Sequence, residues 1–492
     1  IGVLAEYDAL SGIPKCDVSK KEHLDVKKLE NSITSGSSAH GCGHNLLGAG
    51  AMAAALGIKK YLEDSHHKGT VILFGCPGEE GCASKAFFAR DGVWKDVDAA
   101  LTWHPADCNE VVTGSSNSCI QVKYTFKGVS SHASAAPEKG RSALDAVELM
   151  NIGVQFLREH MSDKARVHYA ITDAGGVSPN VVQSKAEVLY MVRSNHVKEA
   201  LELQERVDKI AQGAALMTET SFERTFIDGM SDTITNRTLE KLAYKNFEEL
   251  GVPAHTREEL KVAKEIALTY EGSDKNPGIG SSFDEEYAKK ALDLRTENGS
   301  YMNDFLLPHF MGNAFEPAST DVGDVSYNCP TLQIHVASWP NGCPGHSWQN
   351  VACGGFTIGH KAAVHAGKVL AVTAIDLFEN EEIIKELENK IIELDNEKNE
   401  RDAYFQNFYD EMINMMVIFE QKTQKIMKMQ NNEHPQKKLE INTGSETYDT
   451  NIRSKSKNKN NNIIGSSSTH GKKNNDNKEM FINYTDNFRN KI

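Results

Sequence analysis

The sequence has no excess of basic residues and no long apolar run. Its 492 residues include 54 Lys and Arg against 68 Asp and Glu, which gives a formal net charge of −14. Nonspecific binding to nucleic acid needs a basic surface, so this balance argues against a nucleic-acid partner. A membrane-spanning helix needs about 20 consecutive, predominantly apolar residues. No run approaches that length, so we expect no membrane contact.

The sequence also lacks an even, regularly spaced set of cysteines. Its nine cysteines are scattered from Cys16 to Cys353, a pattern that favours reduced thiols over a disulfide framework. We therefore expect a reducing compartment and a cytoplasmic protein. The sequence starts at Ile1 within an apolar run typical of a buried strand. We therefore expect further residues upstream, and a targeting signal stays open.

Residues 1–113 alternate strand and helix patterns. The short apolar runs 69–75 and 98–103 have the composition of buried strands. Strand and helix in alternation predict an α/β layer with a largely parallel sheet. A helix between Cys42 and Gly69 is indicated by apolar residues at 3–4 spacing, which we expect to face the core: Leu46, Ala49, Met52, Ala53 and Leu56.

Two further regions follow before the tail. Residues 114–230 predict a small α+β domain in which two helices cover one face of a sheet. Residues 231–390 return to α/β character, with a polar, helical stretch over 251–310. The expected strands lie near 120–126, 166–173, 185–194, 221–229 and 331–338, and the expected helices near 140–161, 196–218 and 351–377.

The remaining residues do not have the pattern of an enzyme. Apolar residues from Ile384 to Phe419 keep a heptad register, which predicts a coiled-coil helix over 391–430 and a possible coiled-coil partner for 384–422. Residues 431–492 contain 14 Asn and carry 11 Lys and Arg against 7 Asp and Glu. Such a segment buries too little apolar surface to offset its chain entropy, so we expect disorder.

A Gly-rich turn carries the first candidate metal ligands. In the run His-Gly-Cys-Gly-His-Asn from His40, Cys42 and His44 are two residues apart at the start of a helix. Thiolate and imidazole both suit zinc or a similar divalent metal. By itself, a Cys-x-His pair occurs by chance about as readily as it forms a site.

A pair of carboxylates forms the second cluster. Glu79 and Glu80 follow the 69–75 strand directly, and ligands of α/β proteins bind at the carboxyl ends of the strands. Neighbouring side chains diverge, so one carboxylate can bind a metal while the other acts as general base. An isolated pair of this kind is more often a solvated acidic turn.

Two histidines complete the set. His104 follows the 98–103 strand, and His346 lies in a Gly- and Pro-rich loop after the 331–338 strand. Each alone is more often a structural residue. Together, however, these strand-end and helix-start loops carry Cys, His and Glu side chains, and that combination predicts a two-metal hydrolytic centre.

With these candidate ligands in order along the chain, the sequence resembles the aminoacylase/carboxypeptidase metallopeptidases, peptidase family M20. The resemblance is to the amidohydrolase branch, which includes hydrolases of p-aminobenzoyl-glutamate and of β-alanyl dipeptides. It covers about residues 1–390 in order. The motifs that carry it are Ala-Glu-Tyr-Asp-Ala-Leu from Ala5, the run from His40, and the segments 75–81, 102–105, 128–140 and 319–326.

The resemblance implies a fold and an activity. The fold is a catalytic α/β domain of the metal-dependent exopeptidase type, formed by 1–113 and 231–390 and split by a dimerisation domain over 114–230. The partners are a second copy of the chain and a small N-acyl amino acid or dipeptide. The reaction is amide hydrolysis by metal-activated water with Glu79 as general base. We expect two divalent ions per subunit, zinc, manganese or cobalt.

The resemblance also implies residue roles. The metal ligands are Cys42, His44, Glu80, His104 and His346. Asp8 orients a ligand, and His132 of one subunit stabilises the oxyanion in the site of the other. Asn180 and Arg193 bind the substrate carboxylate. Glu6 stands where many family members have a histidine ligand, so how the second metal is held stays open.

Three other interpretations remain. A catalytically inactive hydrolase fold that binds a partner through its coiled coil would hold metal without turnover. A thiol hydrolase using Cys42 with His40 or His44 would survive a chelator but not alkylation. A different zinc reaction on this fold, such as deamination, would give other products. The sequence specifies neither the acyl group nor the amino acid of the substrate, nor whether the segment after residue 390 is functional.

Overall fold

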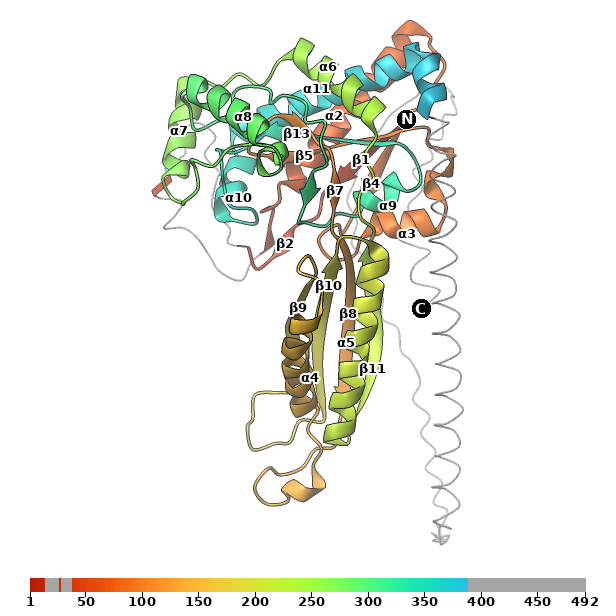
Figure 1. Cartoon of the computed structure of the whole chain (residues 1–492), viewed down its shortest axis with the longest axis vertical. Helices are drawn as coiled ribbons and strands as arrows, with labels where there is room; N and C mark the ends of the chain where they lie inside the picture. The colour runs from red at the N-terminus through yellow and green to blue at the C-terminus, as the bar shows by residue number, and fades with distance from the viewer. Residues whose placement is uncertain (14–25, 28–37, 388–492) are drawn as a thin grey trace, which may run out of the picture. The chain divides into compact units, whose positions relative to one another are not determined.

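The computed structural model describes residues 1–13, 26–27 and 38–387 (Figure 1). The predicted coiled coil over 391–430 and the tail over 431–492 lie outside the described residues. No helix within the described ranges is both long and apolar enough to cross a membrane.

A five-stranded sheet forms the first layer. Its order is β4 (Ile72–Cys76), β1 (Gly2–Glu6), β5 (Ala100–Ala106), β13 (Thr331–Ala337) and β6 (Glu110–Val111). The first four strands run parallel, and β6 pairs antiparallel with β13. The α/β layer with a largely parallel sheet is confirmed. Strand β13 joins β5 although more than 200 residues separate them in the chain, so the layer is built from both ends of the described chain.

Helix α2 (His44–Ser65) packs against the sheet and against α11 (Thr357–Glu379). The prediction that Ala49, Met52 and Leu56 face the core is wrong, since all three are exposed. The buried face of α2 is carried mainly by Leu46, Leu47, Gly50, Ala51, Ala54, Ala55 and Ile58. A Cβ on Gly367 of α11 would meet the α2 backbone at 2.9 Å, so the two helices approach closely along small side chains, and the larger Met and Leu are turned outward.

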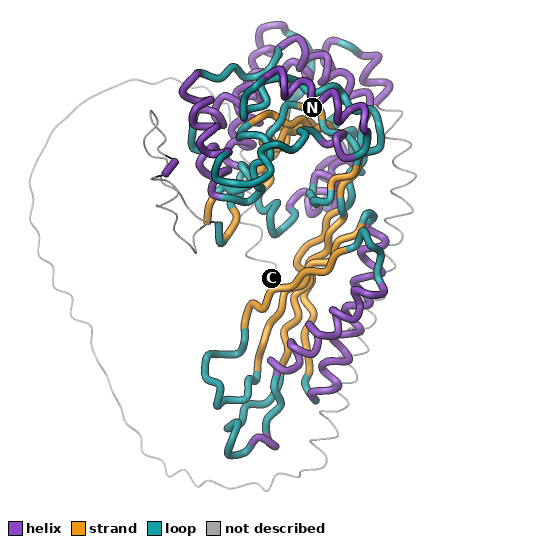
Figure 2. The backbone as a smooth tube through the Cα atoms, turned by 60° about the vertical axis from the view of Figure 1, so that its left-hand side comes forward, coloured by secondary structure: helices purple, strands orange, loops and turns teal. Residues whose placement is uncertain are grey.

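A four-stranded antiparallel sheet forms a second layer, in the order β11 (Ser221–Met230), β8 (Ser118–Lys127), β10 (Lys185–Ser194) and β9 (Arg166–Asp173). Helices α4 (Ala143–Leu157) and α5 (Val197–Thr218) cover one face of it, as Figure 2 shows. Buried and half-buried residues alternate along β10, which is the pattern of a sheet with one covered face. The predicted α+β arrangement is therefore confirmed.

The remaining segments surround the first sheet. The predicted helix over 351–377 is two helices, because α10 (Trp348–Gly354) ends before α11 begins, at Gly354 and Gly355. The stretch 251–310 is helical, as expected, in α7 (Arg257–Ala267) and α8 (Glu285–Asn298). The other elements are β2 (Leu10–Ser11), β3 (Ser38–Ala39), α3 (Ser84–Arg90), β7 (Ser115–Ser116), α6 (Arg237–Leu250), β12 (Phe315–Glu316) and α9 (Val322–Ser326), with 3-10 turns at Val93–Asp96, Pro137–Lys139, Arg158–His160 and Ile279–Ser282.

Candidate metal centre

The turn before α2 brings Cys42 and His44 to the carboxyl edge of the first sheet. Gly43 begins the helix with φ +82, a left-handed conformation that favours glycine. A Cβ there would also lie 3.0 Å from Pro105. Gly41 allows a second close approach, since its Cβ would lie 3.2 Å from the backbone of His346. The glycines of the motif therefore let two distant loops come together beside Cys42.

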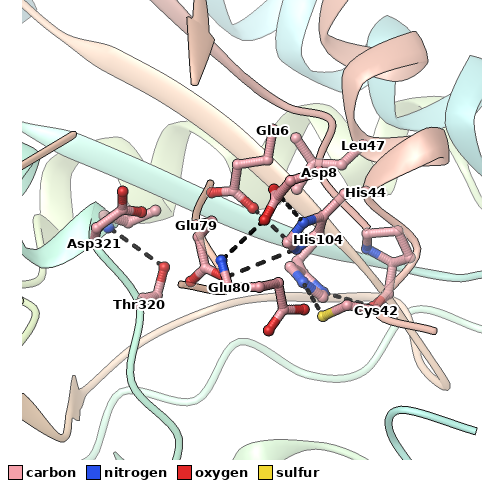
Figure 3. Close-up of polar contacts among 12 residues, drawn as sticks. Glu6, Asp8, Cys42, His44, Leu47, Glu79, Glu80, His104, Thr320 and Asp321 are labelled. Atoms are coloured by element: carbon pink, nitrogen blue, oxygen red, sulfur yellow. Dashed lines mark hydrogen bonds and ion pairs between the residues drawn. The ribbon is translucent and has the colours of Figure 1, made fainter. Parts of the chain in front are cut away.

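Five candidate donors converge at this edge, and Figure 3 shows Cys42, His44, Glu80 and His104 among them. The Cys42 Sγ lies 3.4 Å from His104 Nε2 at the end of β5. His346 Nε2 lies 3.6 Å from Glu80 Oε1. The donor atoms of Cys42, His44 and His104 all lie within 4.8 Å of one another, and so do those of Cys42, Glu80 and His346. The thiol of Cys42 is common to both groups.

Asp8 holds two of these residues. Its carboxylate lies 2.9 Å from His44 Nδ1, and its other oxygen accepts a hydrogen bond from the backbone N–H of Glu80 at 3.0 Å. Although burial opposes both shifts, the two hydrogen bonds lower the pKa of Asp8 to about 2. The hydrogen bond to Asp8 and the charges of Glu6 and Glu79 raise the pKa of His44 to about 9. With Nδ1 bound to Asp8, His44 directs Nε2 toward the centre. This is the carboxylate–histidine arrangement that orients metal ligands.

Glu79 and Glu80 point to different neighbours, as adjacent side chains should. Glu80 faces His346 and Cys42, whereas Glu79 Oε2 lies 4.0 Å from His44 Nε2. Burial raises the pKa of Glu79 well above its usual value, and the nearby carboxylates of Glu6 and Asp321 raise it further. Glu79 is therefore a stronger base than an exposed carboxylate.

The donor set fits a divalent transition metal. His44 Nε2 and Glu80 Oε1 are buried without a hydrogen-bond partner, and unpaired buried polar atoms are costly. The site offers one sulfur, several imidazole nitrogens and a carboxylate. Zinc, cobalt and manganese each bind some of these ligand types. A cation bound by these atoms would satisfy both of the unpaired atoms.

Burial is the main cause of the pKa shifts of two further donors, His104 and Cys42. Burial lowers the pKa of His104 to about 4, helped by the charge of His44, so its imidazole is neutral, as a metal ligand must be. Burial, together with the carboxylates around it, raises the pKa of the Cys42 thiol well above its usual value. A protonated thiol is a poor nucleophile, which argues against a thiol hydrolase, and Cys42 would have to release its proton to bind a metal ion.

Three residues that were predicted to contact the substrate belong to the second layer and not to the edge of the first sheet: His132, Asn180 and Arg193. The β-bridge between His132 and Val181 places His132 beside Asn180, whose carbonyl accepts from the N–H of Ala133 at 2.9 Å. Within the described residues, neither His132 nor Asn180 hydrogen-bonds to the five donors. Arg193 is the last but one residue of β10, and its guanidinium donates to Ser319 Oγ at 3.3 Å.

The sequence did not predict a role for two side chains at the centre, Lys85 and Asp321. Lys85 on α3 is fully buried, and so is Asp321 at the start of α9. They form an ion pair with each other, and Lys85 also pairs with Glu6. Asp321 belongs to one of the motifs that carried the resemblance, so it could have been found. Nothing in the sequence around Lys85 indicates burial.

One other group of metal-binding side chains is already satisfied. Cys108, Glu110 and His335 lie within reach of one another. The carboxylate of Glu110 lies 3.0 Å from His335 Nδ1, accepts from the N–H of Ile279 at 3.1 Å, and also accepts the Cys108 thiol. We therefore interpret this group as a structural network that holds the 277–283 segment against the sheet.

Comparisons with known proteins agree with the family resemblance. Residues 115–219 match the family model described as the M20 peptidase dimerisation domain. The chain is 42% identical to one of the subunits of p-aminobenzoyl-glutamate hydrolase from Escherichia coli over 391 residues, 79% of each protein. It is 32% identical to Xaa-Arg dipeptidase of Mus musculus over 217 residues, 43% of this chain and 50% of that protein.

Among solved structures, the chain is similar to a dinuclear metal-binding peptidase of the M20 family from Bacillus subtilis, at 18% identity. The match has a TM-score of 0.43 and covers 77% of this chain and 81% of that one.

Proposed function

The chain belongs to peptidase family M20 and is a hydrolase of amide bonds, and we propose that it releases amino acids from small N-acyl amino acids or dipeptides at the Cys42 centre. The observation that carries this proposal is the convergence of five donors with Glu79 at their edge. The named relatives act on p-aminobenzoyl-glutamate and on Xaa-Arg dipeptides. In both substrates the scissile amide nitrogen belongs to an amino acid.

In the proposed mechanism, divalent ions would be held by Cys42, His44, Glu80, His104 and His346. When bound, such ions polarise the substrate carbonyl and acidify water. Glu79 takes the proton from the attacking water and passes it to the leaving amine. Its burial beside the ligands, 4.0 Å from His44, suits a base that works without exchanging protons with bulk water.

His132 is proposed to support the developing oxyanion in the site of the partner subunit. Its Nδ1 accepts from the backbone N–H groups of Ser134 and Ala135, at 3.3 and 3.2 Å. The neutral imidazole therefore carries its proton on Nε2 and presents a fixed donor. A donor aimed at developing charge contributes substantially to catalysis.

This role of His132 requires a homodimer. The dimerisation-domain match supports one, and so do the exposed apolar side chains of edge strand β9 and of α4, namely Tyr169, Ile171, Ile152 and Phe156. A monomer in sedimentation velocity under assay conditions would contradict the dimer.

The test of the function is metal-dependent release of an amino acid. We expect the purified chain to release free amino acid from at least one member of a panel of N-acyl amino acids, p-aminobenzoyl-glutamate, β-alanyl dipeptides and Xaa-Arg dipeptides. Chelation should abolish release, and zinc, manganese or cobalt should restore it, because the donor set binds such ions. Activity that survives complete removal of metal would contradict the proposal.

Replacing Arg193 with lysine should raise KM for substrates with a free carboxylate. The charge remains, but the bidentate fork is lost. Since a hydrogen bond to a charged group contributes about 1.5–3 kcal/mol, we expect kcat/KM to fall roughly 10- to 100-fold. The control is the same substrate with its carboxylate amidated, on which both proteins should perform alike. An equal loss on the amidated substrate would show that Arg193 does not bind the carboxylate.

A further inference from the structure

The second sheet carries two arginines side by side on the face opposite α4 and α5. Tyr190 and Val192 of β10 belong to the apolar core that these helices cover. Successive side chains of a strand point to opposite faces, so Arg193 points to the other face. Arg193 pairs directly with Arg166 of the neighbouring strand β9. The two guanidinium groups are therefore cross-strand neighbours on the uncovered face.

Like charges in this arrangement normally destabilise a sheet, because directly opposed side chains have Cβ atoms only about 4.5–5.5 Å apart. The partners of both arginines are neutral. Arg193 donates to Ser319 Oγ at 3.3 Å and to the sulfur of Met191, a weak acceptor, at 3.1 Å. Arg166 Nη1 donates to two backbone carbonyls of the preceding turn, at 2.5 and 2.7 Å. Within the described residues, neither guanidinium forms an ion pair with a carboxylate of the chain.

The surroundings of His168 also show an uncompensated positive charge. His168 of β9 lies opposite Met191, on the same face as the two arginines. Burial lowers the pKa of His168, and the charges of Arg193, Arg158 and Arg166 lower it further. The charges that act on this imidazole most strongly are all positive. An anion is therefore the complement that this end of the face lacks.

This end of the uncovered face adjoins the candidate metal centre. Ser319, which accepts from Arg193, precedes Asp321 by two residues, and Asp321 is buried at the centre. Met191 packs in one apolar cluster with Ala83, which lies on the loop that follows the paired carboxylates. A substrate with its amide at the centre can therefore extend its acidic groups toward the two arginines.

We propose that Arg166 is a specificity-determining residue that binds the side-chain carboxylate of an acidic amino acid, while Arg193 binds the α-carboxylate. Since β9 is the edge strand beyond β10, Arg166 lies one strand further from the centre than Arg193. An N-acyl glutamate has two carboxylates joined by a short carbon chain, which suits two guanidinium groups on adjacent strands. The inference rests on the proposed function and narrows its substrate class to N-acyl dicarboxylic amino acids.

The test compares p-aminobenzoyl-glutamate with p-aminobenzoyl-glutamine, which has the same shape and the same α-carboxylate but a neutral side chain. For the purified chain we expect kcat/KM to be roughly 10- to 100-fold higher on the glutamate compound, mainly through a lower KM, because the bond to Arg166 is charge-assisted. Arg166→Gln can still donate to the two carbonyls of the turn but has no charge. It should remove the preference by raising KM for the glutamate compound alone.

Lys164→Met is the matched control. It removes one positive charge from an exposed side chain two residues before Arg166, and the preference should remain. Equal kcat/KM on the two compounds in the unaltered protein would overturn the inference, and so would a preference that survives Arg166→Gln. If Arg166→Gln does not fold, the comparison in the unaltered protein still decides, and Arg166→Met replaces the variant with the same expected result.

A binding measurement separates this inference from the proposed function. Calorimetry on Glu79→Gln, which lacks the proposed base, measures the affinity for both compounds without turnover. The glutamate compound should bind roughly 10- to 100-fold more tightly, and Arg166→Gln added to this background should remove the difference. Equal affinities, or no detectable binding of either compound, would overturn the inference. A protein that releases no amino acid from any substrate would contradict the proposed function, while these affinities would still decide the role of Arg166.

Discussion

Glu79→Gln should retain the full metal content and lose roughly 10²- to 10⁴-fold in kcat, the range typical of general base catalysis. Glutamine preserves the shape of the side chain but cannot accept a proton. Glu79 also lies outside both groups that share Cys42, so its replacement removes no proposed ligand. The measurement is turnover on the best substrate of the panel together with metal analysis of the same sample.

The neighbouring residue provides the matched control. Glu80→Gln is an identical chemical change one position along the chain, at a residue that faces Cys42 and His346. It should weaken metal binding, and added metal should restore part of its activity. If Glu79→Gln turned over normally, or if it lost metal as Glu80→Gln should, the base assignment would be wrong.

Cys42→Ser should produce the largest loss of metal affinity of any single substitution at the centre. The Cys42 Sγ is common to both donor groups, so its loss affects both proposed ions. Removing residues that only orient ligands typically costs 10- to 100-fold in affinity, and removal of a direct, shared ligand should cost at least about 10²-fold. Competition with a chelator of known affinity measures the effect.

Cys82→Ser is the control for this substitution. Cys82 is an exposed thiol two residues after Glu80, and it belongs to neither donor group. Its replacement should leave metal content and activity unchanged. A Cys42→Ser protein that keeps its metal but loses all activity would instead favour the thiol hydrolase, in which the sulfur attacks the substrate.

Much of the donor set could be predicted because each ligand follows a strand or opens a helix. The ends of parallel strands meet at one edge, so Glu80 after β4 and His104 near the end of β5 were expected at the same edge of the sheet. Asp8 lies 2.9 Å from His44 Nδ1, and its role in orienting a ligand stays a prediction.

Other features depended on contacts that no local pattern encodes. A lysine on a short helix is usually solvated, but Lys85 is buried, and it forms ion pairs with Glu6 of β1 and with Asp321 just before α9, from distant parts of the chain. Likewise, the exposed positions of Met52 and Leu56 follow from the close approach of α11 to α2. Both outcomes are set by tertiary packing, which overrides the local sequence signal.

Because β13 pairs with β5, the two layers can complete their cores at different times during synthesis of the chain. The apolar core of the second layer lies entirely between Ile120 and Phe222, so its contacts are available as soon as that segment has left the ribosome. The core of the first layer joins residues before 112 to residues after 238, and its closure must wait for β13 and α11. Four of the five donors are translated by residue 104, and the last is His346. A nascent chain therefore lacks one of the proposed donors over some 240 residues of elongation, and an ion captured in that interval would be held by four of them at most.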